Sequence, residues 1–148
     1  MKRYSAEADQ EKTAKAYGYE LHCSHKDSIN LAYALKGMKT EKAKQYLQDI
    51  IEEKRPLPAV FHNNKRAHQT GIGPGSFPEK AARYMLKILK NAENNAEYKG
   101  FDTENTKISH ISAYTGRTIK GIMPRAHGRA TDKNTVTTNI EIILEEVE

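Results

Sequence analysis

The feature that most constrains this chain is a long, basic connection between two segments with the character of β-strands. Residues 107–114 form the first segment. Residues 136–147 form the second, in which apolar and polar side chains alternate. Segments this close in sequence pair most simply as a hairpin. Hairpin connections usually have about 2–5 residues, whereas residues 115–135 make about twenty. The chain therefore forms a long surface loop here, or it continues both strands beyond its core.

The composition of the connection favours the second alternative, a two-stranded arm. Residues 116–133 hold five cationic side chains, one acidic side chain and few large apolar residues. At ~3.3 Å per residue, ten residues in each direction would reach about 30 Å from the core. An arm without its own core is marginal in water, so a partner must order it. Closely spaced arginines and lysines suit phosphate groups, because a guanidinium group binds two oxygens at once.

Three glycines and a proline in the connection fit the same arm. Gly116, Gly121 and Gly128 permit sharp turns or close approach between backbones. Pro124 marks where we expect the arm to bend or reverse. A finger of this length threads between segments of folded RNA more readily than into a duplex groove. The residues therefore predict an RNA-binding hairpin, without an RNA-recognition, KH or zinc-finger signature.

Charge and composition limit the other classes of function. The net charge of +5 favours a polyanionic partner, and residues 115–136 alone contribute +4. Residues 137–148 contribute −4, and we interpret Glu141, Glu145, Glu146 and Glu148 as a solvated edge that repels RNA. A single cysteine excludes an internal disulfide framework. No apolar run approaches the ~18 residues that a membrane-spanning helix needs, and no secretory signal is visible. We therefore expect an intracellular protein that does not associate with a membrane.

The rest of the chain predicts a small α+β domain. Residues 1–17 are expected to form an arm or loop, and residues 19–23 a short strand. Periodic apolar positions and capping residues predict three helices, at residues 28–36, 40–54 and 78–99, with a loop at residues 59–77. The predicted fold is three helices packed on a small three-stranded, mostly antiparallel sheet. We expect a single domain, residues 1–148, with a basic β-hairpin extension at about residues 114–138.

Three shorter motifs carry weaker signals. "GIGPG" at residues 71–75 precedes a helix, as a phosphate loop does, but no buried strand precedes it. We favour a loop packed on RNA, because four cations surround it: Lys65, Arg66, Lys80 and Arg83. "HCSH" at residues 22–25 would place His22 and Cys23 on opposite sides of a strand, which disfavours a metal site. His127 lies between two arginines, but no motif positions a second acid or base. We predict no catalytic residue, metal or cofactor.

Several segments together match one protein family. The hairpin is matched by "IMPRAHGRA" at residues 122–130 and "TTNIEIILEE" at residues 137–146. A long helix and its following turn are matched by "FPEKAARYMLKILKNAENNAEYKGFDTEN" at residues 77–105. "RYSAEAD" at residues 3–9 and "LKGMKTEKAKQYL" at residues 35–47 also fit. With these segments the chain resembles the L-twenty-two family of large-subunit ribosomal proteins in its archaeal and eukaryotic form, called L-seventeen in eukaryotes.

The resemblance implies a non-enzymatic component of the large ribosomal subunit in the cytoplasm. Such a protein binds ribosomal RNA, aids subunit assembly and extends a hairpin to the wall of the nascent-peptide exit tunnel. Its implied partners are large-subunit ribosomal RNA, neighbouring ribosomal proteins and the nascent peptide. The alternative is a free-standing basic α+β domain that regulates an RNA or DNA target.

The predicted site residues follow from the sequence and the resemblance together. The tunnel-lining tip of the hairpin is expected to comprise Met123, Pro124, Arg125 and Ala126. The residues expected to bind ribosomal RNA are Arg3, Lys65, Arg66, Lys80, Arg83, Arg117, Lys120, Arg125, His127, Arg129 and Lys133.

Overall fold

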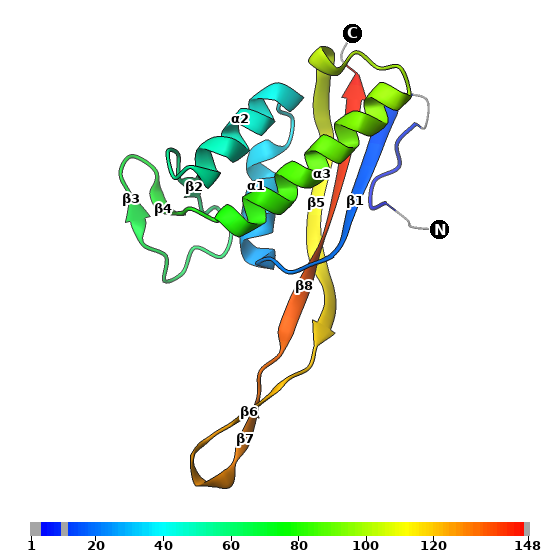
Figure 1. Ribbon diagram of the computed structural model, residues 1–148. Coiled ribbons are helices and arrows are strands. Elements are labelled where there is room, and N and C mark those ends of the chain that lie inside the picture. Colours follow the sequence, from blue (N-terminus) through cyan, green and yellow to red (C-terminus); the bar gives the residue numbers. More distant parts are fainter. Residues whose placement is uncertain (1–3, 10–11, 147–148) are drawn as a thin grey trace.

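A three-stranded antiparallel sheet forms the centre of the molecule. The computed structural model describes residues 4–9 and 12–146. The strands of the sheet are, in spatial order, β1 (Thr13–Leu21), β8 (Thr135–Glu146) and β5 (Thr106–Ile119). The helices on one face are α1 (His25–Leu35), α2 (Thr40–Ile51) and α3 (Glu79–Tyr98) (Figure 1). The predicted fold class, three helices on a small antiparallel sheet with a long hairpin, is confirmed.

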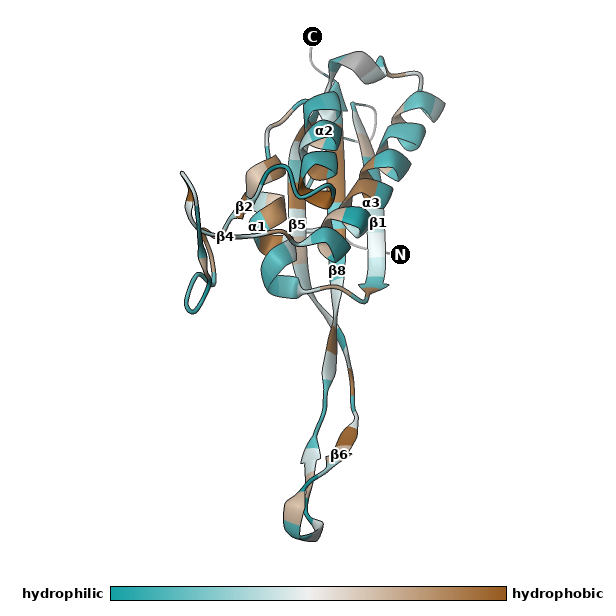
Figure 2. Cartoon of the chain, turned by 60° about the vertical axis from the view of Figure 1, so that its left-hand side comes forward, coloured by the Kyte–Doolittle hydropathy of each residue, from teal (hydrophilic) through white to brown (hydrophobic). Residues whose placement is uncertain are grey.

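The core lies between the three helices and the sheet. Alternate residues of the central strand, Ile140, Ile142 and Leu144, are fully buried and belong to the core cluster. Met85 and Leu89 of α3 are fully buried in the same cluster. Figure 2 shows the hydrophobic residues gathered along this layer, with hydrophilic residues on the outer sides of the helices. Burying each of these side chains stabilises the fold by about 1.5–3 kcal/mol.

The first strand differs from its prediction. β1 begins at Thr13, within the segment expected to be a loop, and ends at Leu21. The buried side chains of β1 are small: Ala14 and Ala16 are almost completely buried. A Cβ atom at Gly18 would collide with the side chain of Ile88 in α3. The small residues of β1 therefore allow α3 to pack close to this strand. Tyr19, the first residue of the strand that the sequence predicted, is 60% exposed.

The helices begin and end largely where the sequence predicted. Two bounds differ by three residues: α2 ends early, at Ile51, and α1 begins early, at His25. Ser24 is the N-cap of α1, and its hydroxyl oxygen accepts from the Asp27 backbone N–H at 3.4 Å. At the end of α3, Gly100 has a φ of +82°, the left-handed conformation that commonly terminates a helix. None of the helices in the described ranges is long and apolar enough to cross a membrane.

The segment expected to be a loop at residues 59–77 forms two strands of a second, small sheet, whose third strand lies just before this segment. The antiparallel strands of this sheet are β2 (Leu57–Pro58), β4 (Gly73–Ser76) and β3 (His68–Gln69), in that order. A Cβ atom at Gly75 would lie 2.8 Å from Ile72 Cδ1 and 3.1 Å from the Leu57 carbonyl oxygen, so glycine permits this close packing. The "GIGPG" motif therefore contributes a strand to this sheet, and the loop prediction was wrong here.

Candidate nucleic-acid interface

The basic connection between the last two strands is a two-stranded arm. Strands β5 and β8 remain paired beyond the helices, as far as Ile119 opposite Thr135. After a short interruption, β6 (Ile122–Pro124) pairs with β7 (Ala130–Asp132). Figure 1 shows this hairpin projecting away from the body, at the opposite end of the sheet from the C-terminus. We use "the arm" below for residues 117–136 and "the body" for the rest of the described chain.

The arm has no core of its own. None of its residues is buried, and only Gly121 and Met123 are half-buried. Ile122 is 76% exposed and Val136 is 44% exposed. Its geometry therefore depends on backbone hydrogen bonds and turns, with almost no contribution from side-chain burial.

The arm reverses just beyond Pro124, which is the last residue of β6. The Arg125 backbone N–H donates to the Arg129 carbonyl oxygen at 2.8 Å and closes the turn. Between them lies a short 3₁₀ segment, η2 (Ala126–Gly128), in which His127 and Gly128 have φ values of 59° and 66°. Two successive left-handed residues turn the chain back.

The two strands of the arm approach each other closely at one of the predicted glycines, Gly121. The Lys133 N–H donates to the Gly121 carbonyl oxygen at 2.7 Å. A Cβ atom at Gly121 would lie only 2.7 Å from the Lys133 carbonyl oxygen. The prediction that glycine permits close backbone contact in the hairpin is therefore confirmed at this position.

The cations of the arm are not neutralised by carboxylates. Arg117, Lys120, Arg125, Arg129 and Lys133 form no ion pair within the described residues. The Arg125 Nε–H group donates to Thr131 Oγ1 at 3.3 Å. This hydrogen bond does not use the two terminal nitrogens of the guanidinium group. The arm therefore presents an extended row of charges able to bind phosphate groups.

Tyrosines gather at the root of the arm. The Tyr114 hydroxyl donates to the Tyr17 hydroxyl oxygen at 2.8 Å, and the two rings lie 6.4 Å apart. Burial and this hydrogen bond raise the pKa of Tyr17 well above its usual value. A hydrogen bond with Glu20 raises the pKa of Tyr19, an effect that the nearby positive charge of Arg117 opposes. With their raised pKa values, the phenols of Tyr17 and Tyr19 stay neutral at physiological pH and add no negative charge beside the arm.

The predicted RNA-binding residues of the body have different surroundings. Arg66 is held within the chain: its guanidinium group pairs with Asp27 at 2.5 Å and donates to Ser76 Oγ at 2.6 Å. Arg83 pairs with Glu79 at 3.1 Å near the surface. Lys65 and Lys80 are exposed. Arg3 lies outside the described residues.

One acidic residue is not where the sequence predicted. Glu141, expected on a solvated edge, is fully buried on the face of the sheet away from the helices. Its carboxylate accepts from the Ser5 backbone N–H at 3.2 and 3.3 Å, and its Oε1 lies 3.2 Å from His110 Nε2. The N-terminal segment therefore covers this face. By contrast, Glu145 is partly exposed and pairs with Lys107 at 3.6 Å, and Glu148 lies outside the described residues.

Metal-ligating residues do not gather in the described part of the chain. No group of three or more His, Cys, Asp or Glu side chains there could hold a metal ion. Cys23 of the "HCSH" motif is buried, with its Sγ atom 3.5 Å from Ser28 Oγ, and His22 is exposed.

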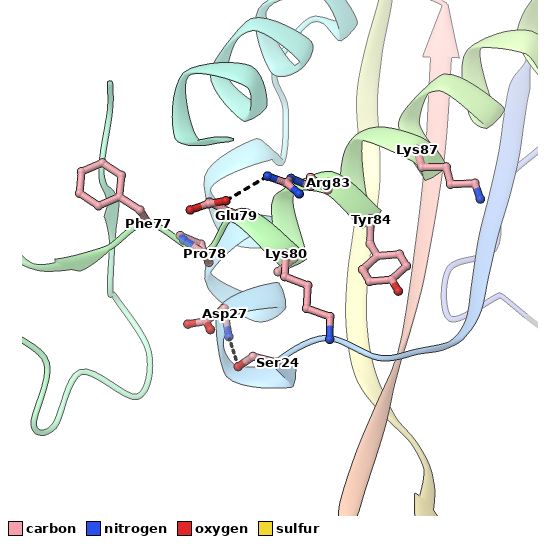
Figure 3. Close-up of a pocket in the computed structure, with 10 residues that line it drawn as sticks. Ser24, Asp27, Phe77, Pro78, Glu79, Lys80, Arg83, Tyr84 and Lys87 are labelled. Carbon is pink, nitrogen blue, oxygen red and sulfur yellow. Dashed lines mark hydrogen bonds and ion pairs between the residues drawn. The ribbon is translucent and has the colours of Figure 1, made fainter. Parts of the chain in front are cut away.

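The sequence did not predict a groove at the start of α3, although two of its lining residues, Lys80 and Arg83, were among the expected RNA-binding residues. Figure 3 shows its lining, with Lys80, Tyr84 and Lys87 projecting from the same side of the helix. The groove has a volume of about 840 Å³ and also involves Ser24 and Asp27. The signal for it was present, because residues 80, 84 and 87 share one helix face. Placing that face beside β1 required the tertiary structure.

Comparison with known proteins gives one consistent result. The family model described as "Ribosomal protein L22p/L17e" matches residues 16–145. The chain is 48% identical over 146 residues to the large ribosomal subunit protein uL22 of Methanococcoides burtonii, covering 98% of this chain and 97% of that protein. It is also 48% identical to uL22 of Methanopyrus kandleri, covering 95% and 91% of the two chains. Identity to uL22 of Sulfurisphaera tokodaii is 46%, over 94% and 93%.

Proposed function

The chain belongs to the ribosomal protein L22p/L17e family, and we propose that it is a structural component of the large ribosomal subunit. In this role it binds ribosomal RNA, helps the subunit to assemble and extends its arm to the wall of the nascent-peptide exit tunnel. Its partners are large-subunit ribosomal RNA, neighbouring ribosomal proteins and the nascent peptide. It works as one domain, residues 1–148, and carries out no catalysis.

The observation that carries this proposal is the arm itself. Its backbone projects from the body with five cations that have no carboxylate partner among the described residues, and none of its residues is buried. A protein gains little stability from such an extension, so its use lies in contact with a partner. Phosphate groups on both sides of the arm would neutralise the cations and cross-link RNA segments. The arm then gains its fixed geometry on binding.

The position of the tip supports the tunnel part of the proposal. Met123 and Pro124 end the outgoing strand of the arm, and Arg125 and Ala126 begin the reversal. These residues lie at the end of the hairpin farthest from the body (Figure 1). They are therefore the first to reach a surface on the far side of the RNA, and His127, Gly128 and Arg129 turn the chain back.

Removing the charges of the arm tests the proposal. The variant R117A/K120A/R125A/R129A should keep the unfolding transition of the wild type, because these side chains are exposed. The wild-type chain, tagged in its host, should sediment with the large subunit at one copy per particle after a high-salt wash. The variant should be depleted from the particle or leave it as salt rises, by roughly tenfold per few lost contacts.

A matched control removes four lysines from the body. The variant K36A/K39A/K42A/K54A has the same change in charge and should remain on the subunit. Wild-type protein that sediments at the top of the gradient would contradict the ribosomal role and favour a dissociable regulator. Full retention of the arm variant would contradict the role of the arm.

A further inference from the structure

A groove in two adjoining parts lies along α3 on the side of β1. Its first part lies beside the start of α3 and is lined by Ser24, Lys80 and Tyr84, among others. Its second part, of about 470 Å³, lies between α3 and β1 and includes Tyr17 and Leu21. The two parts share Tyr84 and Lys87 in their linings, so they are adjacent. We call both together the α3 groove.

One stripe of α3 lines the length of this groove. The stripe comprises Lys80, Tyr84, Lys87, Asn91 and Asn94. Their spacing of three or four residues places them on one helix face. At 1.5 Å per residue, the stripe extends for about 21 Å. That length suits an extended polymer better than a small molecule.

The positive charge of the α3 groove is not neutralised. Its two carboxylates are already engaged, because Asp27 pairs with Arg66 and Glu79 pairs with Arg83. Lys80, Lys87 and Lys90 have no carboxylate partner in the ranges that the structure describes. Another acid of α3, Glu93, is turned to the opposite side of the helix and pairs with Lys44 of α2. The groove therefore attracts anions along most of its length.

Polar groups without internal partners accompany these lysines. Asn91 and Asn94 are exposed, and neither side chain makes a hydrogen bond within the described residues. Their neighbour Asn95 differs, since its Nδ2 atom donates to the Lys15 carbonyl oxygen at 2.9 Å. Tyr84 is half-buried and projects to the same side as Lys80 and Lys87 (Figure 3).

We infer that the α3 groove is a second RNA-binding site, which holds the sugar–phosphate backbone of one ribosomal RNA strand. This inference rests on the proposed function and adds a site on the body, separate from the arm. Lys80, Lys87 and Lys90 bind phosphates, while Asn91 and Asn94 contact 2′-hydroxyl or phosphate oxygens. The lining also includes apolar side chains such as Phe77, Leu21 and Ile88, but a peptide helix that used them as anchors would leave the lysines of the groove without an anionic partner.

Binding of the full-length chain to its host's large-subunit ribosomal RNA tests the inference. The groove variant K80A/K87A/K90A should bind roughly tenfold or more weakly than the wild type at moderate salt. The slope of log K against log salt should fall by about 2, or ~0.7 for each lost phosphate contact. The control K36A/K39A/K42A changes the charge equally at the end of α1 and the start of α2. An equal loss in both variants would show an effect of net charge alone and overturn the inference.

A second measurement identifies the occupant of the groove. A benzophenone amino acid at Asn91, an exposed position, should crosslink to RNA in the assembled subunit. Crosslinks to a protein only, or no crosslink, would overturn the inference. The outcome for the proposed function is separate: if the wild type itself does not bind ribosomal RNA, the proposed function fails. If the wild type binds and the groove variant binds equally well, only the groove inference fails.

Discussion

The body and the arm are built from the same strands but held by different forces. In the body, residues 137–144 of β8 are all buried, because helices cover one face and the N-terminal segment covers the other. In the arm, the same strand begins at Thr135 and Val136 with both side chains exposed. The body is therefore stabilised by burial, whereas the arm has only backbone hydrogen bonds and turns.

The two regions also treat charge differently. The body neutralises some of its cations internally, as in the ion pairs Lys44–Glu93, Arg66–Asp27 and Lys107–Glu145. None of the five cations of the arm is paired in this way within the described residues. The comparison teaches that a chain can use one continuous strand for two purposes, stability at one end and binding at the other.

The largest expected effect comes from deleting the same apolar atoms in each region. Ile142 is fully buried in β8, and Ile122 of the arm is 76% exposed. Ile142→Ala should lower the free energy of unfolding by about 2–5 kcal/mol, because it leaves a cavity. Ile122→Ala should lower it by less than ~0.5 kcal/mol. Urea unfolding of both variants measures the difference, and equal losses would contradict the division into body and arm.

A smaller effect is expected at the buried carboxylate that anchors the N-terminal segment. Glu141→Ala removes the acceptor of the Ser5 N–H and the contact with His110, and should cost about 1–3 kcal/mol of unfolding free energy. Glu145→Ala is the matched control, because its partly exposed ion pair with Lys107 contributes about 1 kcal/mol or less. If both substitutions had the same small effect, the N-terminal segment would not contribute to the stability of the sheet.

The sequence predicted an element well where its hydrophobic pattern is long and its buried and exposed faces differ clearly in hydrophobicity. The apolar stripes of α2 and α3 and the alternation in β8 are long, so they predicted these elements with few errors. β1 was misplaced because Ala14 and Ala16 give its buried face little hydrophobic contrast. The two-residue strands β2 and β3 are too short to have a period at all.

The candidate interface was predictable where it depends on local sequence. The arm followed from a basic, weakly apolar stretch between two strands, and Gly121 lies where the backbones come close. Glu141 could not be placed, because its burial depends on the N-terminal segment, which is distant in sequence. The engagement of Arg66 by Asp27 likewise joins residues that are far apart in the chain. Contacts of this kind leave no periodic signal.

A more local effect is expected from a change inside the arm. Gly121→Ala would place a Cβ atom 2.7 Å from the Lys133 carbonyl oxygen and force the two strands of the arm apart. Amide exchange at Lys133, whose N–H donates to the Gly121 carbonyl oxygen, should become roughly tenfold faster, a change of about 1.4 kcal/mol in local opening. Exchange in the body should stay unchanged. Lys120→Ala, at the neighbouring position, is the control and should change neither the amide exchange at Lys133 nor the exchange in the body.

The smallest effect on stability is expected from the largest change in sequence. Residues 119–135 can be replaced by Asn-Gly, because Thr118 and Val136 are paired and a two-residue turn can join such a pair. The variant should unfold within ~1 kcal/mol of the wild type, because the deleted residues include none that is buried and a shorter connection costs less closure entropy.

The urea dependence of that variant makes the comparison between body and arm quantitative. The m-value scales with the surface exposed on unfolding, so it should stay close to that of the wild type if the arm buries almost nothing. A clear fall in the m-value, or a loss of stability comparable to that of Ile142→Ala, would mean that the arm packs on the body in solution. With both values retained, the body alone would account for folding, and any loss of subunit binding by this variant could be assigned to the missing arm.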